Sequence, residues 1–175
     1  RVLFRSSGGG TGAGKTTSIK MLEPALANVD IIYDTTLSDL DISVELIERG
    51  LKSGRGVTVI YIYRDPLEAF VNGVLPRAAK TGRTVGCPFH VLTHVAARTV
   101  MDQLATRYAS DPRFELIAID NSRGADQQRM VALNTLPYPQ GDRLGAQINL
   151  EIDKAQSAGK LNAQTLASTT PCTQK

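Results

Sequence analysis

Hydrophobic positions along the chain gather into four short continuous runs instead of alternating with polar ones. The runs are Val2–Arg5, Val29–Tyr33, Val57–Tyr63 and Phe114–Ile119. Continuous runs rich in β-branched and aromatic residues are typical of strands in a parallel sheet that is covered on both faces. The pattern therefore predicts four buried strands.

Segments with helical spacing lie between these runs. Ser38 followed by Asp41 matches a capping box, and the helix that it starts is expected to end at Gly54. Asp65-Pro66 predicts the N-cap and the first residue of a second helix, expected to end near Pro76. The positions that fall on one face are Leu40, Val44, Ile47 and Leu51 in the first helix, and Phe70, Val74 and Ala78 after the second N-cap.

A third helix is predicted from about Phe89 to Tyr108. The side chains expected to face inward are Leu92, Val95, Thr99 and Leu104. Strands that alternate with helices favour a three-layer α/β domain with a mainly parallel sheet and flanking helices.

The chain has 175 residues, which is enough for one domain with a sizeable core. After Tyr138 no aromatic residue follows, and Ala, Gln, Thr, Ser and Asn dominate. We therefore expect a core over residues 1–125 and a helical extension and tail over 126–175, with a helix near Ala146–Ala158. Since the first residue is Arg1 and not Met, we expect a fragment, a processed product, or the ordered part of a longer chain.

Composition excludes some classes of function. Hydrophobic residues make up 42% of the chain, and no apolar run approaches the roughly 18–20 residues of a membrane-spanning helix. The net charge of +3 would suit an anionic substrate, but there is no basic and aromatic stripe, so a nucleic-acid partner is not favoured. Cys87 and Cys172 lack metal-ligand spacing, and we interpret them as separate thiols in a reducing cytoplasm.

One segment carries a strong chemical signal. Residues 9–16 read Gly-Gly-Thr-Gly-Ala-Gly-Lys-Thr and match the phosphate-binding P-loop pattern G-x-x-x-x-G-K-[ST]. A predicted strand precedes the loop and a helix-compatible run, Thr16–Leu22, follows it. The residues expected to bind the nucleotide are Gly9, Gly10, Thr11, Gly12, Ala13, Gly14, Lys15, Thr16 and Thr17.

Each residue type in the loop has a physical reason. Glycines let backbone N–H groups wrap around an anion, and the following helix adds its unpaired donors. Lys15 would place a charge between the terminal phosphates, and the Thr16 hydroxyl is the expected Mg²⁺ ligand. The alternative is a glycine-rich turn that only connects a strand to a helix. We predict a purine nucleoside triphosphate site, with ATP and Mg²⁺.

Two classes of P-loop protein, motors and GTPases, are not favoured by this sequence. The chain is too short for most motors, and it lacks the N-K-x-D segment with which GTPases read the base. A small kinase remains, in which arginines on a mobile region neutralise charge on the transferred group. Arg77 and Arg83 are the predicted catalytic arginines, in a basic stretch that also holds Lys80 and His90 and resembles a lid. The alternative is that these residues are solvated surface cations.

Acidic candidates are few. Asp34 ends a predicted strand beside the P-loop, where open α/β sheets bind ligands. We expect Asp34 to hold Mg²⁺ through water, or to act as a substitute catalytic base. Asp39 and Asp41 are interpreted as helix-capping residues, and Asp120 as structural.

These residues together resemble the zeta toxin family of P-loop kinases, from the P-loop through Asn121-Ser122-Arg123-Gly124. In the family a Glu-Gly-Thr-like segment stands where Asp34-Thr35-Thr36 stands here. The resemblance implies that Arg77 contacts ATP phosphate and that a second arginine follows, for which we choose Arg83 although counting favours His90. It also implies that Asn121 and Arg123 lie near the adenine.

The resemblance carries an activity with it. It implies transfer of the γ-phosphoryl group of ATP to a hydroxyl of a nucleotide-type metabolite, typically UDP-N-acetylglucosamine, and a protein antitoxin as natural partner. Other acceptors stay open: NAD, an antibiotic or a nucleic-acid end.

The chain departs from the family pattern in one place. Only 19 positions separate Lys15 from Asp34, whereas family members carry a catalytic aspartate and a helical substrate-binding segment between these landmarks. Either that segment is absent from the sequence between Leu26 and Val29, or the protein has lost it. A nucleotide-binding interaction module without catalysis is therefore the second interpretation.

Overall fold

The computed structural model describes residues 3–21, 29–161 and 171–172. Its strands are β1 (Leu3–Gly8), β2 (Val29–Asp34), β3 (Gly56–Tyr63), β4 (Phe114–Asp120) and β5 (Arg129–Val131). They form one sheet in the order β2-β1-β3-β4-β5, in which β1 to β4 are parallel and β5 is antiparallel to β4. The four predicted strands are confirmed, and β5 is an addition that the hydrophobic pattern did not indicate.

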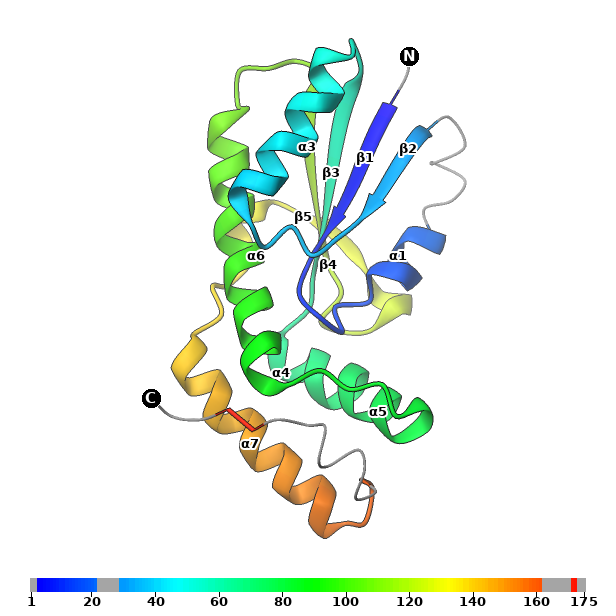
Figure 1. Cartoon of the computed structure of the whole chain (residues 1–175), viewed down its shortest axis with the longest axis vertical. Coiled ribbons are helices and arrows are strands. Elements are labelled where there is room, and N and C mark those ends of the chain that lie inside the picture. Colours follow the sequence, from blue (N-terminus) through cyan, green and yellow to red (C-terminus); the bar gives the residue numbers. More distant parts are fainter. Residues whose placement is uncertain (1–2, 22–28, 162–170, 173–175) are drawn as a thin grey trace.

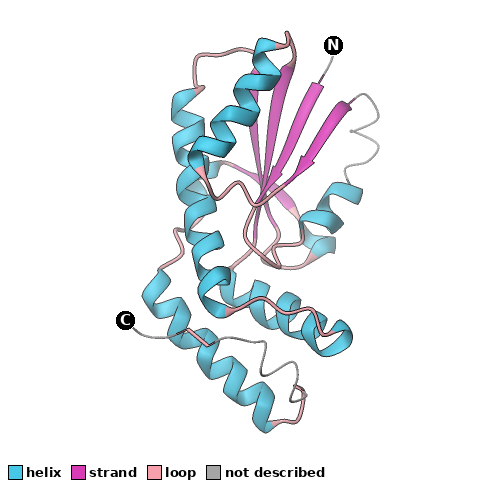
Figure 2. Cartoon of the chain, viewed as in Figure 1, coloured by secondary structure: helices cyan, strands magenta, loops and turns pink. Residues whose placement is uncertain are grey.

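Helices cover both faces of this sheet (Figures 1 and 2). Alternate residues of β3, from Val57 to Tyr63, pack with α3 (Leu40–Lys52) and α6 (Cys87–Arg107). The intervening Ile60 and Ile62 pack on the other side, with Ala13 just before α1 (Lys15–Met21). The predicted three-layer α/β fold is therefore confirmed. Of the described helices, none is long and apolar enough to cross a membrane.

Two helix starts test the capping predictions. Asp65 is the N-cap of α4 (Pro66–Ala69), and its Oδ1 accepts a hydrogen bond from Glu68 N at 3.0 Å, as predicted. The N-cap of α3 is Asp39, whose Oδ1 accepts from Ile42 N at 3.0 Å, so the prediction that Ser38 starts this helix was wrong. Ser38 instead pairs its hydroxyl with that of Thr36 at 2.9 Å, which leaves the cap position to the carboxylate.

The second helix extends further than its sequence indicates. After α4 the backbone continues through a π-helical turn, η1 (Phe70–Val74), into α5 (Leu75–Thr81), which ends at Gly82 in the left-handed region (φ 68°). The predicted end at Pro76 was wrong, because this proline occupies the first turn of α5, where its missing N–H is tolerated.

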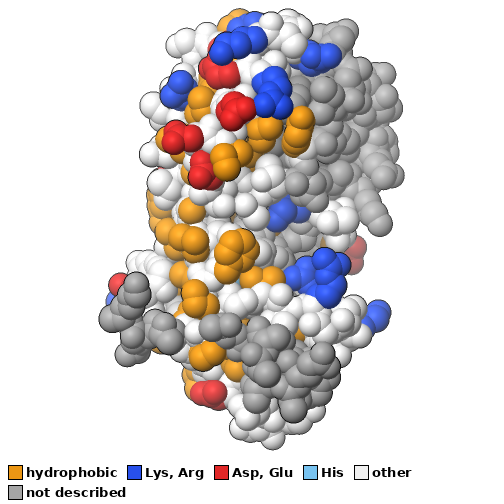
Figure 3. Space-filling model, in the orientation of Figure 1, with side chains coloured by type: hydrophobic (Ala, Val, Ile, Leu, Met, Phe, Trp, Pro, Cys, Tyr) orange, Lys and Arg blue, Asp and Glu red, His pale blue; other side chains and the backbone are white. Residues whose placement is uncertain are grey.

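The buried face of α6 differs from the predicted one. Leu104 is buried, but Leu92 is 61% exposed and Thr99 is also exposed. The inward side chains include His90, Thr93, His94, Ala97, Arg98, Met101 and Leu104. Figure 3 shows hydrophobic side chains gathered on the surface over α6, the helix that carries the exposed Phe89 and Leu92. The prediction failed because the inner face of this helix is partly polar.

The helix α7 (Gly141–Ser157) contributes to a second hydrophobic core. Leu144, Ile148 and Ile152 pack there against Phe70 and Val74. The helix predicted near residues 146–158 is thus confirmed with an earlier start, while the division at residue 125 stays a prediction.

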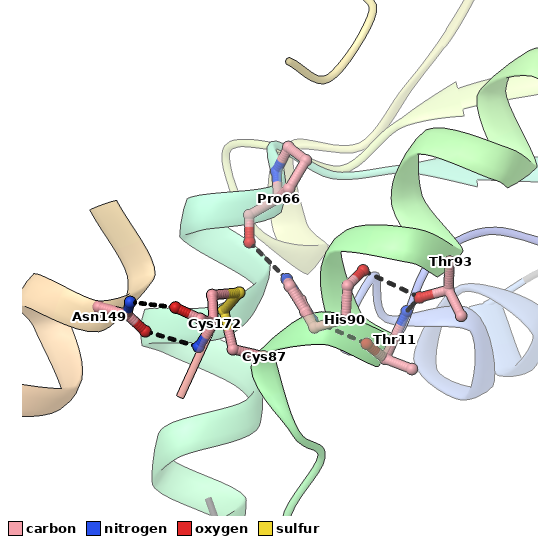
Figure 4. Close-up of a disulfide and its surroundings, with 7 residues drawn as sticks. All are labelled: Thr11, Pro66, Cys87, His90, Thr93, Asn149 and Cys172. Atoms are coloured by element: carbon pink, nitrogen blue, oxygen red, sulfur yellow. Dashed lines mark hydrogen bonds between the residues drawn. A yellow bond between two sulfur atoms is a disulfide. The ribbon is translucent and has the colours of Figure 1, made fainter. Parts of the chain in front are cut away.

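The two cysteines are joined, which corrects their interpretation as separate thiols. Cys87, at the start of α6, forms a disulfide with Cys172, 85 positions away (Figure 4). The side chain of Asn149 also binds Cys172: Nδ2 donates to its carbonyl at 2.7 Å, and Oδ1 accepts from its N–H at 2.8 Å. The sequence separation alone gave no sign that these two residues meet.

Candidate functional site

The P-loop follows β1 at the sheet edge that faces α4 and α5 (Figure 1). Gly9, Gly12 and Gly14 have φ angles of 137°, 75° and 90°, which L side chains rarely adopt. Surrounding protein also approaches closely: a methyl group at Gly12 would lie 2.6 Å from Ala69 O, and one at Gly10 would lie 2.2 Å from the ring of His94. The glycines are therefore required both by backbone conformation and by packing.

Three consecutive P-loop carbonyl groups accept hydrogen bonds from side chains outside the loop. The pairs are Thr11 O with His94 Nε2 at 2.9 Å, Gly12 O with Arg64 Nη1 at 3.4 Å, and Ala13 O with Asn121 Nδ2 at 2.8 Å. In a trans peptide the N–H and C=O groups point in opposite directions. The N–H groups of Gly12 and Gly14 are therefore turned away from the supporting side chains, as anion binding requires. The N–H of Ala13 instead donates to Gly10 O at 3.3 Å within the loop.

Lys15 follows the loop as the first residue of α1. Its Nζ donates to Gly9 O at 2.9 Å and to Gly10 O at 3.2 Å, so the ammonium group is held against the start of the loop. Thr16 and Thr17, in the first turn of α1, are exposed. The loop and the first turn of α1 thus supply an ammonium group, two exposed hydroxyls and backbone amides, and this donor set fits a polyphosphate chain with its Mg²⁺.

Residue Thr11 is bound from α6 by three buried side chains, His90, Thr93 and His94, which we name the α6 polar stripe. Figure 4 shows Thr11 with two of them, His90 and Thr93. The Thr11 N–H donates to Thr93 Oγ1 at 3.4 Å, and the Thr11 carbonyl accepts from His94 Nε2. His90 Nε2 lies 2.8 Å from Pro66 O, which only accepts, so this nitrogen carries the proton. His90 Nδ1 then accepts from the Thr11 hydroxyl at 2.7 Å.

Burial keeps both imidazoles neutral. Desolvation lowers the pKa of His90 below its ordinary range. Desolvation, with the nearby His90 and Lys15, lowers the pKa of His94 to about 3. The neutral forms are those that the hydrogen bonds to Thr11 and Pro66 use.

A second group supports the loop from the segment after β4. Asn121 is buried, and besides its bond to Ala13 O it accepts a hydrogen bond from Gln128 Nε2 at 3.2 Å. The same Gln128 nitrogen donates to Ser18 Oγ in α1 at 2.8 Å. The P-loop and the helix after it are therefore tied to one amide network.

The chain matches the model of a known protein family. A family model described as Zeta toxin matches residues 25–127, which is more than half of the chain. The chain belongs to the zeta toxin family. The matched residues begin after the P-loop of this chain and end a few positions beyond Asn121. No curated protein matches the chain.

Solved structures resemble this zeta toxin family member in fold. The crystal structure of AvrRxo1-ORF1:AvrRxo1-ORF2 with sulphate ions aligns with a TM-score of 0.62 at 18% identity, over 98% of this chain and 77% of that one. The AvrRxo1-ORF1:-ORF2 structure with ATP aligns with a TM-score of 0.60 at 19% identity and the same coverage. At sequence identities this low, the structural matches show a shared fold and nothing more.

The predicted acid lies beside the P-loop. Asp34 is the last residue of β2, and its backbone is in register with Ser7 of β1. Gly9 N donates to Thr36 O at 3.1 Å, so the segment after Asp34 contacts the start of the loop. Asp34 thus lies at the carboxyl ends of the strands, and its role as a Mg²⁺-holding or catalytic acid stays a prediction.

The predicted arginines lie at the surface. Arg77, Arg83 and Arg123 are exposed. A Cβ on Gly73 of η1 would lie only 3.0 Å from Gly12 O, so this part of the helix touches the P-loop. Arg77 lies four residues further along the same continuous helix, in the first turn of α5. His90 is not at the surface of the site, since both its nitrogens bond to protein.

Sequence reasoning missed the groups that support the loop from outside. Arg64, Thr93, His94 and Gln128 contact the P-loop or α1 and were not among the predicted residues. For α6 a signal existed, because His90, Thr93, His94, Ala97 and Arg98 follow the spacing of one helix face. No local pattern marked Arg64 or Gln128.

Proposed function

We propose that this chain is an ATP-dependent kinase that moves the γ-phosphoryl group of ATP to a hydroxyl of a small nucleotide-type metabolite, such as UDP-N-acetylglucosamine. The observation that carries the proposal is the binding of the Thr11 and Ala13 carbonyls from outside the loop, which turns the N–H groups of Gly12 and Gly14 away from the supporting side chains and supports a phosphate site between them. Membership of the zeta toxin family supports the kinase class. The fold shared with a structure described as containing ATP supports the nucleotide.

In the proposed reaction, the acceptor hydroxyl oxygen forms a bond to the γ-phosphorus. The bond from that phosphorus to the β,γ-bridging oxygen breaks, and its electron pair leaves with ADP. The P-loop amides and Lys15 hold the phosphates, while Arg77 and Arg83 approach the transferred group from the surface side. Asn121 and Arg123 are proposed to lie toward the adenine.

We also propose residues for the Mg²⁺ ion and for the proton of the acceptor hydroxyl. Thr16 and Asp34 would hold Mg²⁺, which neutralises phosphate charge when bound. In the alternative role, Asp34 does not hold the metal and instead accepts the proton of the acceptor hydroxyl. We further propose a small-molecule acceptor and a protein antitoxin as partners, which the two-chain assemblies of the structural neighbours support.

Labelled phosphoryl transfer tests the proposal. The protein is incubated with γ-labelled ATP and Mg²⁺ against UDP-N-acetylglucosamine, NAD and an aminoglycoside, with Lys15→Ala as the matched control. Label is expected on one acceptor with the wild type, and transfer by Lys15→Ala is expected to fall at least about a hundredfold. Equal transfer by both proteins, or none by either, would refute the kinase assignment.

A nucleotide-binding module without catalysis is the second candidate. It is favoured by the short connection between α1, which reaches Met21, and β2, which starts at Val29. That connection leaves little length for a base-carrying segment. Calorimetry separates the two candidates, because a module binds ATP but shows no additional heat of reaction when any acceptor is supplied.

A further inference from the structure

The α6 polar stripe uses nearly all of its polar atoms on the P-loop and on its own support. Thr93 Oγ1 donates to His90 O at 3.0 Å while it accepts from Thr11 N. His90 bridges Pro66 O and the Thr11 hydroxyl, and its ring lies 4.5 Å from that of His94 between centroids. Every polar group of Thr11 is thereby bound by α6.

Folding α6 onto the sheet does not by itself explain these residues. His90 and His94 are only 0% and 3% exposed, whereas Phe89 and Leu92 on the same helix are 54% and 61% exposed. Buried imidazoles and hydroxyls destabilise a core unless they find partners, and an apolar face would bury more favourably. The hydrogen bonds to Thr11 therefore account for the side of α6 that is buried.

The contacts fix the two peptide groups on either side of Thr11. In the Gly10–Thr11 peptide the N–H points to Thr93, so the Gly10 carbonyl points the other way, where it accepts from Lys15 Nζ at 3.2 Å. In the Thr11–Gly12 peptide the carbonyl points to His94, so the Gly12 N–H points into the loop. One set of side chains thus orients both the lysine acceptor and a phosphate-facing amide.

We propose that His90, Thr93 and His94 are positioning residues for the phosphate site, which hold the P-loop in its nucleotide-binding conformation through Thr11. The inference rests on the proposed function, since it assigns these residues to the binding of ATP. They do not touch the nucleotide. Their effect on ATP passes through the two peptide groups that flank Thr11.

Matched substitutions separate positioning from core packing. His94→Phe keeps a ring against Gly10 but removes the donor to Thr11 O, whereas His94→Gln keeps an N–H donor at the position of Nε2. Thr93→Val removes the acceptor for Thr11 N–H, whereas Thr93→Ser keeps it. Val100→Ala shortens a buried α6 side chain that packs in the sheet core, away from the loop.

Calorimetric titration with Mg²⁺ and ATP is read beside thermal unfolding for each variant. His94→Phe and Thr93→Val are expected to weaken ATP binding about tenfold, as loss of an oriented hydrogen bond predicts. His94→Gln and Thr93→Ser are expected to stay within about threefold of the wild type, while Val100→Ala lowers the melting temperature with unchanged ATP affinity. If His94→Phe fails to fold, Thr93→Val alone decides the result.

Opposite outcomes have distinct meanings. Wild-type ATP affinity in folded Thr93→Val and His94→Phe, with only a lower melting temperature, would overturn the positioning role and leave the kinase proposal intact. Absence of ATP binding by the wild type would overturn both. Nitrogen-15 spectra of the imidazoles give a check without nucleotide: His90 is expected as the neutral Nε2–H tautomer, and a charged or Nδ1–H form would contradict the geometry.

Discussion

Gly14 and Asn121 lie so close that substitutions at the two positions are expected to be coupled. A Cβ added to Gly14 would lie 2.4 Å from Asn121 Nδ2, the atom that donates to Ala13 O, and 3.7 Å from Asn121 Cγ. Gly14→Ala therefore strains a residue at φ 90° by about 1–2 kcal/mol and also displaces the amide of Asn121. The displaced amide leaves the Ala13 carbonyl without its donor, which costs about 1–3 kcal/mol.

In an Asn121→Ala background the contact is gone, so adding Gly14→Ala costs only the backbone strain. The two substitutions together are expected to destabilise the protein by about 1–3 kcal/mol less than the sum of their separate effects. Urea unfolding of the wild type, both single variants and the double variant measures this difference.

Gly54→Ala is the matched control for backbone strain. Gly54 has a φ of 77°, and nothing lies within 4 Å of a Cβ added there. Its effect is expected to add to that of Asn121→Ala within about 0.5 kcal/mol. Additive behaviour of Gly14→Ala with Asn121→Ala, within the same margin, would refute the contact that the reasoning requires.

Three further predictions concern other parts of the molecule. Replacing Cys87 and Cys172 by serine is expected to lower the unfolding free energy in urea by about 4 kcal/mol, because the disulfide closes a long loop in the unfolded chain; unchanged curves would contradict this. The pKa of His94 is lowered to about 3 in the folded protein, so the unfolded chain binds a proton first as the pH falls. The free energy of unfolding is therefore expected to decrease as the pH is lowered from about 6.5 toward 3. His94→Gln removes this contribution, and an equally steep pH dependence of its unfolding would count against the assignment. Arg77→Ala is expected to lower kcat about a hundredfold with a smaller effect on ATP binding, whereas Arg77→Lys recovers part of the rate; unaltered turnover would remove Arg77 from the site.

The strands and the P-loop follow from local sequence. A continuous apolar run such as Val57–Tyr63 identifies a buried strand because both its faces are covered in the fold. The glycine pattern identifies the loop because few other sequences tolerate its backbone angles. β5 was not predicted, since its three residues are Arg129–Val131, of which two are exposed, and no hydrophobic pattern marks them. Tertiary pairing with β4 alone defines that strand.

The largest error concerns α6, and its cause is the polar surface that this helix meets. Hydrophobic periodicity assumes that the inner face of a helix meets an apolar core, which placed Leu92 and Thr99 inside. The inner face instead meets the polar backbone of Thr11, so His90 and His94 occupy the buried positions. The disulfide between Cys87 and Cys172 was missed for a different reason: pairing at a separation of 85 positions depends on the tertiary fold.

Amide chemical shifts of the P-loop report most directly whether its backbone binds a triphosphate. A ¹⁵N-labelled sample is titrated with Mg²⁺ and a non-hydrolysable ATP analogue, with adenosine as the matched ligand that lacks phosphates. The amides of Gly12, Gly14, Lys15 and Thr16 are expected to shift with the analogue and not with adenosine, and these shifts are expected to weaken in Lys15→Ala. Unmoved loop amides at saturating analogue, or the same shifts with adenosine, would contradict the phosphate site.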